Sequence, residues 1–326
     1  GRDFCCTKKP SEELTNFLSR KPGQDGKRAK KLEPGTCSFY DNAAYPFEIS
    51  AHPVDHSIFG ATAYILQGDT TIAYTGDFRL HGRNDSPDNE TTSEKSVCDV
   101  CRDKVGSASG LIIADFSARN FERLESFQNI AEKMGRELVV PAKDIYMLQA
   151  LACIDNACKM DSLRVYSEIG NKSRKWEQVV QPLFFDQYVN HETIRENPDN
   201  FILCFSFFDM KHLLDIKPNG GTYIYSACEA FSEEMEIDFV RLWHWLEHFK
   251  IDPVGFSVEK EDGGNYYPTF DKRFHASGHA SREDLKWVID QVDPDYLVPI
   301  HTESRDWFVK NFENVILVDE GIPYDF

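Results

Sequence analysis

Apolar and polar positions alternate along the chain in a way that predicts strands and helices in turn. Residues 61–66 and 70–74 are rich in β-branched and aromatic side chains and flank a Gln-Gly-Asp turn, which predicts a β-hairpin. A short apolar run over 111–114 predicts a buried strand, and helical spacing over 120–134 predicts an amphipathic helix. This alternation favours an α/β architecture.

The second half of the chain continues the same pattern. Further elements are predicted at 138–140 (a strand), 143–156 (a helix) and 231–246 (a long amphipathic helix). Ser281 is placed as the N-cap of a helix that runs to about Val292. The apolar run 296–300 then predicts a buried strand that ends at His301.

Ionisable side chains follow several of these predicted strands directly. Asp77 follows the hairpin, Asp115 follows the strand 111–114, and His301 follows the run 296–300. Strand ends are where α/β proteins commonly place reactive groups. Each residue has a structural explanation when taken singly, such as a helix cap or a hydrogen-bonded core histidine.

Histidine and aspartate together indicate a metal site more specifically than either residue type does alone. Zinc takes imidazole nitrogen and carboxylate oxygen, and two-metal hydrolytic sites gather such ligands from several strand ends. His56, Asp77 and His301 have suitable types and positions for metal ligands. A second histidine-rich segment, 275–279, precedes the Ser281 cap.

Composition sets outer limits on the function. The 326 residues are 41% hydrophobic, which excludes a disordered chain, and their longest apolar stretch, 201–208, is far shorter than the roughly 20 residues that span a bilayer. We therefore expect a soluble, cytoplasmic protein without a membrane partner. The net charge of -18 argues against coating nucleic acid through bulk positive charge. The basic cluster within 20–31 fits either a solvated loop or a local phosphate-facing patch.

The cysteine pattern indicates reduced thiols. Nine cysteines are an odd number, and few of them have metal-ligand spacing. Cys98 and Cys101 are spaced as in a metal clip, but no second pair lies at finger distance. A structural zinc at this pair is one alternative, and two ordinary thiols are the other.

Four segments, in order, resemble the motifs of a known family. They are PVDHSIFGA (53–61), YTGDFR (74–79), HASGHA (275–280) and LVPIHTE (297–303). They resemble metallo-β-lactamase proteins with a β-CASP insertion, and most of all those that are ribonuclease J-like. The resemblance implies an α/β fold, namely an N-terminally incomplete αββα metallo-β-lactamase sandwich with an inserted α/β β-CASP domain. It implies core segments at 1–135 and 263–326 and an insertion at 136–262.

The same resemblance assigns roles to single residues. His56, Asp77 and His301 are implied as metal ligands, with Asp77 bridging two metals. Asp77 also counts among the implied catalytic residues, together with Asp115, which sits where the family has its first β-CASP acidic residue, and His279, which is held near the scissile phosphate. The residues implied to bind phosphate oxygens are His275, Ser277 and Ser226.

The implied function is a zinc-dependent phosphodiesterase that acts on single-stranded RNA in processing or decay. Such a site holds two zinc ions when it is complete, and zinc lowers the pKa of a bound water molecule to make a nucleophile. A homodimer is one assembly that this interpretation allows, and the sequence does not determine the oligomeric state. One rival is a non-catalytic RNA-binding or scaffold protein of the same fold. Another is a hydrolase that acts on DNA or on a small phosphoester.

One motif of the family does not occur in the sequence. A two-metal site of this fold uses His-x-His-x-Asp-His, and the segment from His52 to His56 has the wrong spacing for it. Either the sequence is the C-terminal part of a complete enzyme, or the first half-site has been lost. Because three ligands are fewer than two zinc ions require, we expect weak or absent zinc and negligible turnover from this chain alone.

Overall fold

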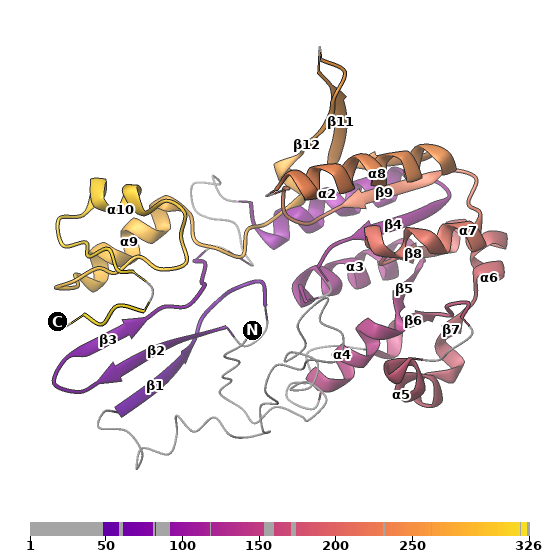
Figure 1. Ribbon diagram of the computed structural model, residues 1–326. Helices are drawn as coiled ribbons and strands as arrows, with labels where there is room; N and C mark the ends of the chain where they lie inside the picture. Colours follow the sequence, from indigo (N-terminus) through magenta and orange to yellow (C-terminus); the bar gives the residue numbers. More distant parts are fainter. Residues whose placement is uncertain are drawn as a thin grey trace.

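Three sheets, of seven, three and two strands, organise the part of the chain that is described. The structure is a computed structural model, and it describes residues 48–58, 61–80, 82, 92–117, 119–152, 160–170, 174–230, 232–261, 263–319 and 321–324. Figure 1 shows a large sheet flanked by helices and, apart from it, a smaller sheet beside the C-terminal helices. The basic cluster within 20–31 lies outside the described residues.

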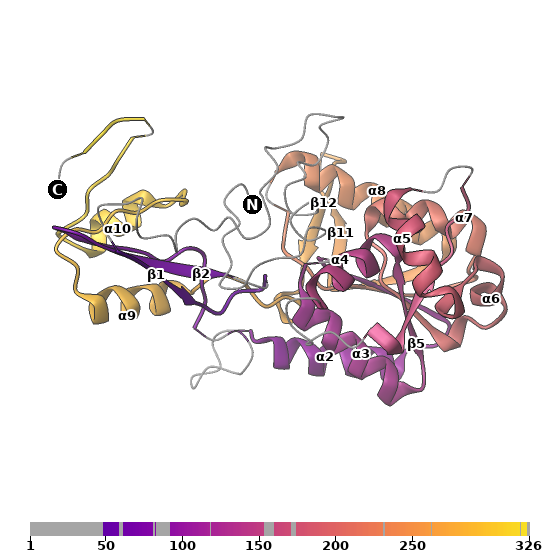
Figure 2. The same ribbon diagram turned by 90° about the horizontal axis from the view of Figure 1, so that it is seen from below.

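The smaller sheet contains the predicted hairpin. Its strands, in the order β1-β2-β3, are β1 (Glu48–Pro53), β2 (Thr62–Gln67) and β3 (Thr71–Tyr74), and both pairings are antiparallel. The register pairs Gln67 with Thr71, so β2 and β3 are joined by a short turn, as predicted. The helices α9 (Arg282–Val292) and α10 (Arg305–Asn311) lie beside this sheet in both views (Figures 1 and 2).

The predicted start of the C-terminal helix is confirmed, and the prediction of a strand after that helix is wrong. Ser281 caps α9, because its Oγ accepts a hydrogen bond from the backbone N–H of Asp284 at 3.1 Å. Residues 296–300 form only a single parallel bridge, between Leu297 and Val315. Pro299 has no backbone N–H to donate to a ladder, which limits pairing along this segment. His301 then takes a left-handed conformation, with φ of 52°.

The larger sheet has seven strands, and every pairing is parallel. Its order is β10-β9-β4-β8-β5-β6-β7. The strands are β4 (Leu111–Asp115), β5 (Glu137–Pro141), β6 (Leu163–Tyr166), β7 (Tyr188–Val189), β8 (Phe201–Leu203), β9 (Gly221–Tyr225) and β10 (Ile251–Val254). Its helices are α2 (Glu94–Ser107), α3 (Phe121–Met134), α4 (Ala142–Ala152), α5 (Lys175–Leu183), α6 (His191–Glu196), α7 (Leu213–Ile216) and α8 (Glu233–Phe249). None of the described helices is both long enough and apolar enough to cross a membrane.

Helices cover both faces of this sheet, and the interior strand β4 shows why. All five residues of β4 are buried, and its four apolar residues alternate between two hydrophobic clusters. Ile112 and Ala114 pack with residues of α2, α3, α4 and α5, whereas Leu111 and Ile113 pack with residues of α6, α7 and α8. A continuous apolar strand of this kind is typical of a parallel sheet with both faces covered. The predicted α/β class is confirmed.

The domain limits expected from the resemblance fall inside two of the sheets. β4 is an interior strand of the seven-stranded sheet, between β9 and β8, and like α2 and α3 it precedes residue 136, so the limit at 135/136 divides one sheet between two domains. The limit at 262/263 falls between β11 (Phe256–Lys260) and β12 (Tyr266–Phe270), which form an antiparallel hairpin. The pairing partners of β4 lie some ninety or more residues further along the chain, which local patterning could not show.

The link between β10 and β11 requires glycine. Gly255 has φ of 92°, and a Cβ added there would lie well inside contact distance of the Tyr225 carbonyl oxygen. We expect Gly255→Ala to lower the free energy of unfolding by about 2–4 kcal/mol, because it combines a backbone penalty with a steric clash. Urea denaturation measures the change.

Gly135→Ala is the matched control for this prediction. Gly135 also has a positive φ, of 65°, but a Cβ there meets nothing within 4 Å. It should therefore show only the backbone penalty of about 1–2 kcal/mol. Equal losses in the two variants would contradict the role given to the Tyr225 carbonyl.

Candidate metal centre

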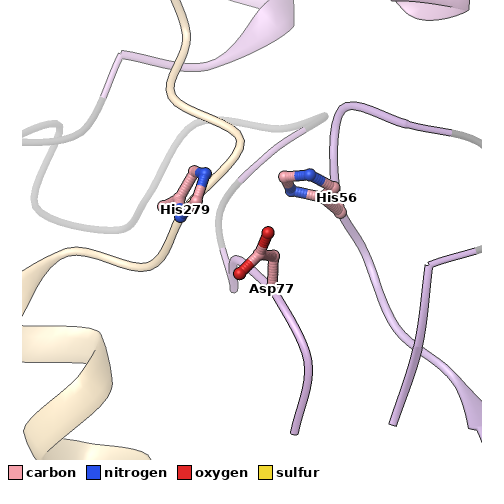
Figure 3. Close-up of side chains that lie close together, drawn as sticks. All are labelled: His56, Asp77 and His279. Carbon is pink, nitrogen blue, oxygen red and sulfur yellow. The ribbon is translucent and has the colours of Figure 1, made fainter. Parts of the chain in front are cut away.

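Three side chains from distant parts of the sequence converge near the smaller sheet. His56 follows β1, Asp77 follows β3, and His279 precedes α9. One ligand atom from each lies within 4.8 Å of the others (Figure 3). His56 and Asp77 are half-buried, and His279 is exposed. Two imidazoles and one carboxylate form a donor set that fits Zn²⁺.

Backbone hydrogen bonds hold the Asp77 segment on both sides. The Arg79 N–H donates to the Asp55 carbonyl at 2.9 Å, next to His56. The Ala280 N–H donates to the Phe78 carbonyl at 2.6 Å, next to His279. The three candidate ligands are therefore positioned by the backbone of their immediate neighbours.

The hydrogen bond of His56 determines which of its nitrogens is free. Nδ1 of His56 contacts the carbonyl oxygen of Gly278. A carbonyl can only accept, so Nδ1 carries the proton and Nε2 carries the lone pair that a metal needs. The ring also meets His279 edge to face, with centroids 5.3 Å apart.

Gly278 leaves no room for a side chain at this contact. A Cβ built there would lie 2.7 Å from Cε1 and 2.9 Å from Nδ1 of His56. We expect Gly278→Ala to displace the imidazole and to weaken zinc binding by about 10–100-fold, as the loss of a partner that orients a metal ligand does. Competition with a chromophoric chelator measures the affinity. Gly263→Ala, where a Cβ meets nothing within 4 Å, should bind zinc like the original chain.

His301 lies beside the three-residue group. Its Nδ1 is 3.4 Å from Oδ1 of Asp77, and its side chain is 78% exposed. The closest grouping among the described residues therefore contains His279, which was expected near the scissile phosphate, rather than His301. The role of His301 as a metal ligand stays a prediction.

Asp115 lies in different surroundings, at the carboxyl end of β4. It is 8% exposed, and the Tyr223 hydroxyl donates a hydrogen bond to its carboxylate. Burial raises the pKa of Asp115 to about 7, and the nearby Asp209 adds to that rise. The three-residue group found among the described residues does not include it. Its catalytic role stays a prediction.

The raised pKa makes stability depend on pH. The native state holds the Asp115 proton more tightly than the unfolded chain does, so this residue contributes stability that is lost as pH rises from about 4 to about 7. Asp115→Asn cannot ionise. We therefore expect the unfolding free energy of the variant, relative to the original chain, to increase over that range. Urea denaturation at pH 4.5, 5.5 and 7 measures it, and a constant difference would contradict the assignment.

The three predicted phosphate-binding residues differ in their accessibility. Ser226 is 1% exposed, and its Oγ donates to the Phe274 carbonyl at 2.7 Å. His275 is half-buried, and burial together with the nearby Arg123 lowers its pKa. Ser277 is exposed, and its Oγ accepts from the His279 N–H at 3.0 Å. Of the three, only Ser277 is exposed beside the metal group, and the binding role of all three stays a prediction.

Cys101 takes part in packing. It is fully buried in α2, with its Sγ 3.8 Å from the Ser226 Oγ, and burial raises its pKa to about 11. Neither Cys98 nor Cys101 belongs to a potential metal group within the described ranges. These observations favour two ordinary thiols over a structural zinc.

Comparison with known proteins identifies the relatives. Residues 272–316, which contain His275, Ser277, His279 and His301, match a family model described as "RMMBL: Zn-dependent metallo-hydrolase RNA specificity domain". Ribonuclease J of Pyrococcus abyssi is 26% identical over 198 residues, which is 61% of this chain and 39% of that protein. Ribonuclease J of Thermus thermophilus is 21% identical over 318 residues, which is 85% of this chain and 51% of that protein.

Together these matches support a ribonuclease J-like β-CASP metallo-β-lactamase family for the chain. That family agrees with the four segments in which the resemblance was found. A crystal structure of a protein of unknown function from Enterococcus faecalis V583 shares the fold, with a TM-score of 0.59 and 21% identity over 85% of this chain and 64% of that one. The chain spans about half the length, or less, of these two ribonucleases J.

Proposed function

We propose that this protein belongs to the machinery of metal-dependent hydrolysis of RNA phosphodiester bonds. The observation that carries the proposal is the convergence of His56, Asp77 and His279, which are more than 200 residues apart at the extremes. The matched RNA-specificity domain supports RNA as the substrate class, because it supplies His279 and the neighbouring Ser277.

Each residue of the centre has a distinct part in this proposal. His56 presents Nε2 and Asp77 presents a carboxylate oxygen to the metal, and His279 holds the third donor position. A bound zinc ion supplies Lewis-acid activation of water and of a phosphoryl oxygen. Ser277, exposed next to His279, donates its hydroxyl to a phosphate oxygen of the RNA. His301 lies at the edge of the centre, and its Nδ1 is close enough to the Asp77 carboxylate for both side chains to bind the same metal ion.

The donors found among the described residues support one metal ion rather than two. The part of the chain that is described offers one group of three donors, and His301 is the nearest additional nitrogen. Catalytic zinc sites use three protein ligands and keep an open position. We therefore propose weak binding of a single zinc ion, with little turnover by these 326 residues themselves.

Zinc content and RNA cleavage, measured side by side, test this proposal. The expected result is one zinc per chain by elemental analysis after zinc addition, and slow, chelator-sensitive cleavage of a single-stranded RNA oligomer that His56→Ala abolishes. RNA cleavage that persists in His56→Ala and in chelator would contradict a metal-dependent reaction. RNA binding without cleavage, independent of zinc, would favour a non-catalytic RNA-binding protein, and preference for a matched DNA oligomer would change the substrate.

A further inference from the structure

Buried charges lie between the metal centre and the seven-stranded sheet. Arg79 is 3% exposed, Glu94 is 4% exposed, and Arg123 is completely buried. Burying a charge is costly unless it is paired, so three such side chains in contact form a structural unit. None of the three was expected to matter from the sequence.

Arg79 joins this unit to two of the candidate ligands. Its Nη2 lies 3.1 Å from Oδ1 of Asp55 and also pairs with Glu122, and its Nη1 lies 3.8 Å from Oε1 of Glu94. Asp55 immediately precedes His56, and Arg79 is two residues after Asp77. A movement of the Arg79 guanidinium would therefore displace the backbone next to both His56 and Asp77.

Arg123 joins the same unit to the segment of the third ligand. Its Nε donates to Oε2 of Glu94 at 2.8 Å. Its Nη1 donates to the carbonyl oxygens of Ser226 at 2.6 Å and Phe274 at 3.1 Å. Phe274 begins the short stretch that leads to His279.

Glu94 is the residue that links the two arginines. It is the first residue of α2, after the N-cap Ser93, and Glu122 and Arg123 lie in the first turn of α3. A carboxylate near a helix N-terminus is favoured by the helix dipole, so Glu94 is anchored by its own helix as well as by its partners. It therefore attaches the metal-ligand segments to two rigid helices of the large sheet.

We propose that Glu94 is a positioning residue that couples metal binding at His56, Asp77 and His279 to the first turn of α2, beside the direct contacts of Arg79 and Arg123 with the first turn of α3. This inference rests on the metal centre of the proposed function. Metal binding orders the segments on either side of Arg79 and Phe274. Because the Arg79–Glu94–Arg123 unit contacts the first turns of α2 and α3, ordering of these segments also restricts motion in the two helices and at the sheet face that they cover.

Hydrogen exchange with and without zinc tests the coupling in the 326-residue chain. In the original chain, saturating zinc should slow exchange at residues 53–58 and 74–80, and also in the first turns of α2 and α3. We expect about a 10-fold slowing in those turns, within the range of typical coupling between sites. In Glu94→Gln, the slowing near His56 and Asp77 should remain, and so should slowing in α3, which Arg79 still contacts through Glu122. The slowing in α2 should fall below about 2-fold.

Two further variants keep the test decisive. Glu137→Gln removes a half-exposed partner of Arg164 on the same sheet and should leave the coupling unchanged. Arg79→Lys keeps the charge but loses the planar fork that reaches Asp55, Glu94 and Glu122 together, so it should lose the coupling even if Glu94→Gln does not fold.

Different failures have different meanings. If zinc slows α2 equally in Glu94→Gln, in Arg79→Lys and in the original chain, the coupling proposal is overturned while the metal centre stands. If zinc binds but slows only the ligand segments of the original chain, the coupling is likewise overturned. If elemental analysis finds no zinc on the original chain, the metal centre fails and the coupling fails with it.

Discussion

Asp77→Asn should weaken zinc binding on the order of 100-fold, a larger effect than that of any other single change at the centre. The substitution keeps the size of the side chain and removes its negative charge. Asp77 is the only carboxylate in the three-residue group, and its Oδ1 also lies 3.4 Å from Nδ1 of His301. Its loss leaves the two imidazoles of the group to bind a dication, without the Coulombic attraction that a carboxylate provides.

The measurement compares zinc affinities by chelator competition and checks the fold by circular dichroism. Asp69→Asn is the matched control, because Asp69 is exposed in the turn between β2 and β3 of the same sheet. It makes the same change of charge and should alter the affinity less than about 2-fold, since surface charges are screened by solvent. Equal weakening in both variants would show that net charge, and not ligation, controls zinc binding.

Sequence patterning predicted those regular elements that have a strong local signal. The hairpin of β2 and β3 shows β-branched residues around a turn, and the helix α9 has Ser281 at its N-cap. The strand expected at 296–300 had an apolar pattern, but it also contains Pro299, which has no N–H to donate to a neighbouring strand. The segment pairs only through the Leu297–Val315 bridge. Local signals therefore predict elements well and their pairing poorly.

The candidate site was predictable where it depends on residue type and order. His56 and Asp77 were identified as partners, and the structure brings them together. The choice between His279 and His301 as the nearest third donor depends on how residues 275–301 lie against the small sheet, which no local pattern encodes. Asp115 lies at the end of a strand, much as Asp77 does, yet its strand is an interior strand of the other sheet, so it meets Tyr223 instead of the metal group.

The buried ion unit was missed for a related reason. Glu94 and Arg123 each look like ordinary surface residues of an amphipathic helix start, where charged side chains are common. Only the packing of α2 against α3 brings them together and removes both from water. The helical pattern places Arg123 next to apolar Leu124, which is a weak sign that Arg123 is buried. The pattern carries no information about Glu94.

Arg123→Met should lower the free energy of unfolding by about 3–5 kcal/mol, the usual cost of removing one partner from a buried ion pair. Arg123 is completely buried, and its guanidinium contacts Glu94, Ser226 and Phe274, so the variant leaves a buried carboxylate and two carbonyl oxygens without this donor. Methionine fills a similar volume, which limits any cavity to a small part of the loss. Urea denaturation at pH 7 measures the change.

Arg164→Met is the control, because its partner Glu137 and Arg164 itself are both roughly 40% exposed. Such a pair contributes about 0–1 kcal/mol, so the two variants should differ severalfold. The double variant Arg123→Met with Glu94→Gln removes both charges together and should recover part of the loss, because no uncompensated carboxylate then remains in the interior. Purely additive losses would mean that Arg123 stabilises the protein through its carbonyl contacts alone, and that Glu94 does not depend on it.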